Sequence, residues 1–121
     1  MTLRELITWQ ANGYERFHAT RANLAIHMVM VPLFWIGNVA VVAALWHWSV
    51  WGVIGGSAAM VVSIAVQGKG HAMEPVPSVP FSGWQNIVAR IFLEQWLTFP
   101  RFVLSGGVLR AWRAVATGDR L

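Results

Sequence analysis

The pattern of charged and apolar positions divides this chain into a long uncharged middle and two charged flanks. No Lys, Arg, Asp or Glu occurs from residue 22 to residue 68, which is 47 residues in a row. A helix needs about 20 apolar residues to cross a bilayer core, so this stretch is long enough for two spans. We predict them at 24–46 and 51–68, joined by a tryptophan-rich turn, as an antiparallel hairpin. Pro32 is expected to kink the first span.

The flanks predict shorter helices. Residues 2–19 have helical spacing of apolar positions, and Thr2 with Glu5 forms a capping-box pattern. Three prolines at 75–80 predict an extended loop. A third helix is expected from about Ser82 to Phe99, where Pro100 interrupts it, and a short, half-inserted fourth one over 101–116.

The third predicted helix carries a polar stripe on an otherwise apolar surface. Its members recur at roughly helical spacing: Asn86, Arg90, Glu94, Thr98 and Arg101. Arg90 and Glu94 are one turn apart, so the spacing allows them to pair. Charged groups are costly inside a bilayer, so this helix lies at the interface or turns its stripe toward the hairpin.

Composition supports a membrane protein of one domain, residues 1–121. The chain is 56% hydrophobic and only 12% charged, with a mean hydropathy of +0.52. Its basic residues flank the apolar segments, which predicts an integral membrane protein with cytoplasmic termini, in the inner membrane if the source is bacterial. The net charge of +4 is scattered, so no nucleic-acid partner is expected. The chain has no cysteine, which excludes thiolate chemistry. An oligomer is compatible with the sequence. The predicted fold class is all-α: a small integral membrane helical bundle, with amphipathic helices at both ends of the hairpin.

Histidines flank the uncharged stretch and return to the same side of the predicted hairpin. His71 and Glu74 have a His-x-x-Glu spacing that metal sites in helix bundles use. Asn23 and His27 are one turn apart on the first span. Spacing alone leaves both pairs equally compatible with plain hydrogen bonding. His47 lies at the opposite interface and is expected to have no part in a site.

His18 poses a geometric problem. Nine residues of unbroken helix rotate by about 900°, which would put His18 and His27 on opposite faces. The two can share a metal only if the chain bends near Thr20–Asn23. Thr20 or Asn23 could cap a new helix there. The spacing leaves open whether such a bend exists.

Two blocks of residues together resemble a known family. The first is Tyr14-x3-His18-x4-Asn23-x3-His27-x4-Pro32, and the second is Gln67-x2-Gly70-His71-x2-Glu74-x2-Pro77. They are similar to the small membrane 2-hydroxy fatty acid dioxygenases, and the resemblance covers roughly residues 10–80. The region from Phe92 to Gly107 departs from that pattern.

The resemblance implies an Fe(II)- and O2-dependent membrane enzyme that shortens 2-hydroxy fatty acids by one carbon in α-oxidation. It implies His18, His27 and His71 as iron ligands, with Glu74 as a further ligand or a neighbour that supports them. Asn23 is expected to orient a histidine rather than to bind iron, since amides bind iron poorly. Lys69 or Arg21 is expected to pair with the substrate carboxylate.

Two other classes of function stay open at this stage. His27 and His71 lie on different helices at similar depth, as two axial haem ligands would. A membrane scaffold without catalysis would use the same histidines only for hydrogen bonds. A Soret band would favour haem, and the absence of stoichiometric metal would favour the scaffold.

Overall fold

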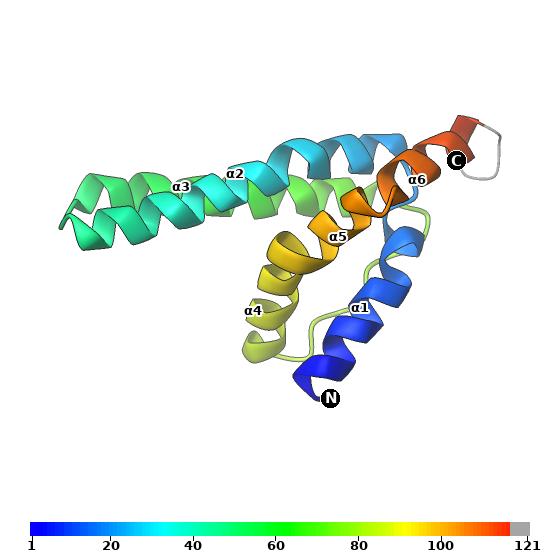
Figure 1. Ribbon diagram of the computed structural model, residues 1–121, viewed down its shortest axis with the longest axis horizontal. Helices are drawn as coiled ribbons and strands as arrows, with labels where there is room; N and C mark the ends of the chain where they lie inside the picture. The colour runs from blue at the N-terminus through cyan, green and yellow to red at the C-terminus, as the bar shows by residue number, and fades with distance from the viewer. Residues whose placement is uncertain (117–121) are drawn as a thin grey trace.

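The computed structural model describes residues 1–116, and every regular element in this part of the chain is a helix (Figure 1). The all-helical prediction is therefore confirmed. In chain order the elements are α1 (Leu3–Phe17), α2 (Arg21–Trp46), α3 (Val50–Ala72), α4 (Trp84–Leu93), the π-helix η1 (Glu94–Thr98), α5 (Phe99–Leu104) and α6 (Gly107–Ala116).

The predicted hairpin is formed by α2 and α3, two helices long and apolar enough to cross a membrane. They lie side by side as a long rod (Figure 1). Small residues allow the close approach: a Cβ on Gly37 would lie 2.7 Å from the Gly56 carbonyl oxygen. The helix α2 continues through Pro32 without interruption.

At the far end of the hairpin, the turn after α2 is a Schellman motif. Ser49 N–H donates to the Ala44 carbonyl and Trp48 N–H to the Leu45 carbonyl, at 2.8 and 3.4 Å. Trp48 occupies the left-handed position with a φ of 55°. The side chain of Ser49 then caps α3 by accepting from Gly52 N–H. The turn therefore reverses the chain within three residues.

The chain bends between α1 and α2, where the geometric argument required it. The helix α1 ends at Phe17, and His18 follows as its C-cap with a non-helical backbone. Thr20 begins α2 as an extended N-cap whose side chain accepts from Asn23 N–H. His18 and His27 are thus on different helices.

The third predicted helix differs from expectation at its C-terminal end. Pro100 does not end it, because the chain widens into η1 and continues through α5 to Leu104. A π turn pairs a carbonyl with the N–H five residues on, and the partner of Gln95 would be Pro100, which has no N–H. The Gln95 carbonyl instead accepts from the Trp35 indole at 2.7 Å.

Arg90 does not use the pairing with Glu94 that its spacing allows. The Arg90 guanidinium donates to the carbonyls of Val79 and Pro80, at 2.9 and 3.2 Å, and holds the proline-rich loop. It also lies over the Trp9 and Phe81 rings. Glu94 is left to turn toward the hairpin.

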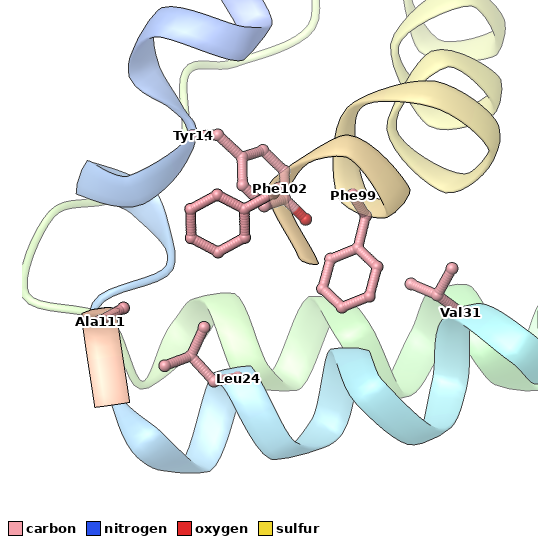
Figure 2. Packing of buried hydrophobic residues seen from close by; sticks show 6 residues of the cluster. All are labelled: Tyr14, Leu24, Val31, Phe99, Phe102 and Ala111. Carbon is pink, nitrogen blue, oxygen red and sulfur yellow. The ribbon is translucent and has the colours of Figure 1, made fainter. Parts of the chain in front are cut away.

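The core lies where the shorter helices cover one half of the hairpin. Figure 2 shows Tyr14 from α1 and two phenylalanines from α5 meeting residues of α2; the cluster is Tyr14, Leu24, Val31, Phe99, Phe102 and Ala111. The other half of the hairpin projects beyond these helices (Figure 1). The covered half is the one that carries His18, His27 and His71.

Candidate metal centre

Three imidazole rings meet inside the covered half of the hairpin. Ring centroids of His18 lie 4.6 Å from both His27 and His71, and those of His27 and His71 lie 5.1 Å apart. His18 comes from the α1–α2 bend, His27 from α2 and His71 from the end of α3. His27 is fully buried and His18 nearly so. The structure therefore brings together the three histidines expected as ligands, and leaves His47 exposed at the far turn.

Two of these rings are oriented by the same backbone device. His18 Nδ1 lies 2.8 Å from the Tyr14 carbonyl, and His27 Nδ1 lies 3.0 Å from the Asn23 carbonyl. A carbonyl only accepts, so each Nδ1 carries the proton, and each Nε2 presents a lone pair. Both Nε2 atoms are buried without a hydrogen-bond partner among the described residues, as is His71 Nδ1.

Glu94 faces these lone pairs. Its Oε2 lies 3.1 Å from His18 Nε2 and 3.6 Å from His27 Nε2. Two kinds of acceptor then point at one another, an arrangement that needs a cation between them, either a proton or a metal ion. Ligand atoms from His18, His27, His71 and Glu94 all lie within 4.8 Å of one another.

The electrostatics of Glu94 follow from this position. Burial raises the pKa of its carboxyl, but the contacts with His18 and His27 outweigh burial and hold the pKa well below the usual range. The side chain is 17% exposed, so one side of the carboxylate remains accessible. Glu94 is the first residue of the π-helix η1, and π turns are often found at functional sites.

Glu74 does not join this group, so of the two roles expected of it, ligand or neighbour that supports the ligands, its position fits the second. Its carboxylate accepts four hydrogen bonds at the α1–α2 bend: from the Ala19 and Thr20 N–H groups, the Thr20 hydroxyl and the Asn23 amide, at 2.8 to 3.1 Å. Partial burial raises the pKa of Glu74, yet these bonds outweigh it and lower the pKa below its ordinary value. Glu74 therefore fixes the bend that carries His18.

Asn23 lies between Glu74 and His27. Its amide nitrogen donates to Glu74 Oε2 at 3.0 Å, and its backbone carbonyl orients His27. It is fully buried. Gly70 allows this packing, since a Cβ there would clash with the Asn23 side-chain oxygen. The supporting role expected of Asn23 stays a prediction.

A cavity of about 250 Å³ opens beside the imidazoles, between α1, α3, α4 and the proline-rich loop. Its wall includes His18, His71 and Glu94, and is otherwise mainly apolar, with Arg90 as the only cationic side chain lining it among the described residues. Lys69 is exposed and does not line it. Arg21 donates instead to the Trp112 carbonyl. The structure thus does not bring Lys69 or Arg21 to the site.

A buried amide pair next to the cavity was not anticipated. Gln67 on α3 and Gln95 on η1 exchange two hydrogen bonds, at 2.9 and 2.8 Å. Gln67 also donates to the Ser63 hydroxyl, which donates to the Met30 carbonyl. This network joins η1 to both hairpin helices and so holds Glu94 in place.

Glu94 itself had a weak signal in the sequence: it is the only acidic residue between Pro75 and Gly118. Tyr14, by contrast, was part of the first motif. Its ring stacks on His18 with centroids 3.8 Å apart, and its buried hydroxyl has no hydrogen-bond partner among the described residues. Burial first, and the nearby Glu94 charge second, raise the pKa of Tyr14 well above its usual range.

Comparisons with known proteins add no relative to this picture. No family model matches the chain, and no match is found among curated proteins or among solved structures. The function therefore has to be argued from the chain itself.

Proposed function

We propose that this protein is a membrane-embedded, Fe(II)-dependent oxygenase whose metal ion is held by His18, His27, His71 and Glu94. The observation that carries the proposal is the convergence of unpartnered buried ring nitrogens on one carboxylate oxygen. Burying polar atoms without partners costs free energy, and a metal ion would satisfy all of them together.

The donor set fits Fe(II). Imidazole and carboxylate donors are typical of non-haem iron sites that react with O2, and four protein donors leave coordination positions open. When bound, the iron would supply O2 activation and electron transfer. The chain supplies the rest: Tyr14 and Asn23 carbonyls fix two rings, and Glu74 fixes the bend between them. The apolar wall of the cavity keeps bulk water from the reacting atoms.

The proposed substrate is a 2-hydroxy fatty acid. The resemblance of the two histidine blocks supports this class, and the mainly apolar cavity beside the metal group suits an acyl chain. The reaction balances as 2-hydroxy acid plus O2 giving the acid one carbon shorter, CO2 and water. The bond between the first two carbons breaks, and O2 takes up the four electrons released.

The proposed setting is a membrane in which the start of α2 and the end of α3 lie on the cytoplasmic side. Support comes from α2 and α3, and from the exposed tryptophans of the far turn, since indole rings collect at bilayer interfaces. Because the chain has no cysteine, single cysteines can be introduced cleanly. Arg16→Cys and Lys69→Cys should label from one side, and Trp48→Cys from the other. Opposite labelling of positions 16 and 69 would exclude the hairpin topology.

The activity test uses purified protein in detergent, loaded with Fe(II) without oxygen and then exposed to O2. We expect one iron per chain and O2-dependent conversion of 2-hydroxyhexadecanoic acid to the acid with 15 carbons. Hexadecanoic acid, which lacks the hydroxyl, is the matched control and should remain unchanged. Glu94→Gln should lose iron and activity together. If the protein binds iron but converts no 2-hydroxy acid, the proposed oxygenase activity is rejected and the proposed metal site is retained.

A haem protein is less well supported. A porphyrin must lie between its two axial imidazoles. His27 and His71 have ring centroids 5.1 Å apart, and His18 and Glu94 fill the space beside them. A scaffold that only hydrogen-bonds is also less well supported, because it would need a buried proton between Glu94 and the imidazoles and would still leave His71 Nδ1 without a partner.

A further inference from the structure

The hydroxyl of Tyr14 is a buried polar group whose purpose the metal ligands do not explain. Tyr14 is 3% exposed, and its hydroxyl lacks a hydrogen-bond partner among the described residues. A phenylalanine would fill the same space without leaving a buried donor unpaired. Buried tyrosines ordinarily find a partner for this group, so its isolation calls for a ligand or a neighbouring acceptor.

The tyrosine ring is held firmly. One face stacks on His18 at an interplanar angle of 12°, and its edge meets Phe102 with ring centroids 5.0 Å apart. Figure 2 shows the side chain extending from α1 toward the segment that carries Phe99 and Phe102. The hydroxyl is therefore placed by packing on several sides, which gives a hydrogen bond from it a defined direction.

The acidic group on this side of the phenol is Glu94: its Oε2 lies 3.1 Å from Nε2 of His18, the ring on which Tyr14 stacks with centroids 3.8 Å apart. Tyr14 and Glu94 line the same cavity. Glu94 Oε2 faces the imidazoles of His18 and His27. A carboxylate has several lone pairs, so the Tyr14 hydroxyl on α1 can donate to one that the imidazoles do not use. A carboxylate on a metal ion is commonly held by such a donor.

We propose that the Tyr14 hydroxyl donates a hydrogen bond to the Glu94 carboxylate when a metal ion is bound, and so holds that carboxylate toward His18 and His27. This inference rests on the proposed metal site. Tyr14 is thus a positioning residue, acting through Glu94.

The test compares the wild-type protein with Tyr14→Phe, which removes one oxygen atom and keeps the ring that stacks on His18. The probe is Co(II), which has visible absorption bands that depend on coordination geometry, titrated into metal-free protein against a competing chelator. We expect Tyr14→Phe to bind Co(II) about 10–100-fold more weakly and with altered visible bands. The melting temperature of the metal-free protein should be unchanged or higher, since the variant removes an unpartnered buried hydroxyl.

Two further variants separate the hydroxyl from the ring. Ser105→Ala removes a hydroxyl that donates to the Phe102 carbonyl behind the same aromatic cluster, and it should leave Co(II) binding unchanged. Tyr14→Leu also removes the ring, and should lower both the melting temperature and the metal affinity. The inference would be overturned, with the metal site intact, if the wild type binds Co(II) and Tyr14→Phe binds it with the same affinity and the same visible bands. Failure of the wild type to bind Co(II) or Fe(II) would overturn both.

A second measurement needs no substitution, because Tyr14 is the only tyrosine in the chain. Protein made with 3-fluorotyrosine would give a single fluorine resonance from this ring. We expect the resonance to shift as Zn(II), which is diamagnetic, is added, and to stop shifting at one equivalent. An unchanged resonance on saturation with Zn(II) would show that the phenol does not respond to the metal, and would overturn the inference.

Discussion

The two ends of the hairpin are built from the same uncharged stretch of sequence, yet they differ in what they bury. At the α1 end, α2 buries Asn23 and His27 completely, and α3 buries Gln67. At the turn, Trp46, Trp48 and Trp51 are 82%, 93% and 81% exposed. The difference arises because α1 and the helices after α4 cover only one half of the rod (Figure 1).

This comparison shows where polar groups are tolerated and why. A buried polar group is costly unless it is hydrogen-bonded. At the covered end, Asn23, Gln67 and Glu74 have partners for most of their polar atoms. Most of the exceptions gather around Glu94: they include ring nitrogens of all three histidines and the Tyr14 hydroxyl. Their isolation distinguishes a binding site from the satisfied network around it.

The largest expected difference between the two ends is in metal binding, and two histidines of the same helix hairpin test it. His27→Ala should abolish stoichiometric binding of Fe(II), because it removes a fully buried donor and one of the two imidazole contacts of Glu94. His47→Ala should bind one ion per chain, since His47 is an exposed C-cap at the turn. Metal analysis after gel filtration measures both. Equal iron in the two variants would show that the imidazole cluster is not the site.

The bend that carries His18 depends on Glu74, so its loss should destabilise the covered end. Glu74→Gln removes the negative charge and replaces one carboxylate oxygen with an NH2 group. The donors that now bond to two oxygens would then have only one acceptor. We expect a loss of about 1–3 kcal/mol in the free energy of unfolding near pH 7. Thermal unfolding in detergent, followed by circular dichroism, gives the difference.

The same variant has a pH dependence with a definite sign. The pKa of Glu74 is lowered in the folded protein, so its stabilisation is complete above the unfolded value of about 4.3 and is lost as pH falls through the folded value. The gap between wild type and Glu74→Gln should therefore narrow below about pH 4.3. A gap that is constant from pH 7 to pH 3 would show that the carboxylate charge does not stabilise the bend.

The hairpin and the bend could be predicted because each rests on a regular rule. The hairpin followed from an uncharged run long enough for two spans, and the bend from the rotation of a straight helix between His18 and His27. The expected set of three histidines came from the family resemblance, and the structure places those rings together. Their binding of iron stays a prediction.

The separation of Glu94 from Arg90 could not be predicted from a uniform helical period. With 3.6 residues per turn, the two lie one turn apart on the same face and form a natural pair. The proline-rich loop supplies carbonyls that take Arg90, and the π turn begins at Glu94. Neither a loop carbonyl nor a single wide turn has a regular sequence signal, so both depend on tertiary structure.

The packing of the uncovered half can be tested with two adjacent glycines. A Cβ on Gly56 would lie 2.8 Å from the Gly37 carbonyl oxygen and from Val41 Cγ2, whereas a Cβ on Gly55 meets nothing within 4 Å. Gly56→Ala should therefore destabilise the hairpin by about 1–3 kcal/mol through overpacking. Gly55→Ala should be neutral or stabilising by up to about 1 kcal/mol, because alanine favours a helix. Equal melting temperatures would contradict the close contact of α2 and α3.

The smallest expected effect is at the turn, where Trp48 has a positive φ. The left-handed conformation costs a residue with a Cβ roughly 1–2 kcal/mol, and glycine avoids this cost. Trp48→Gly should then stabilise the turn in detergent by about 1 kcal/mol. Trp46→Gly is the control: it lies in the last turn of α2, where glycine costs about 1 kcal/mol relative to a good helix former. The two substitutions remove the same exposed indole but should shift the melting temperature in opposite directions. If both lower it equally, the indoles stabilise the turn by contacts that outweigh the backbone strain. In bilayers the gain from Trp48→Gly should shrink, since the tryptophan is expected to anchor the turn at the interface there.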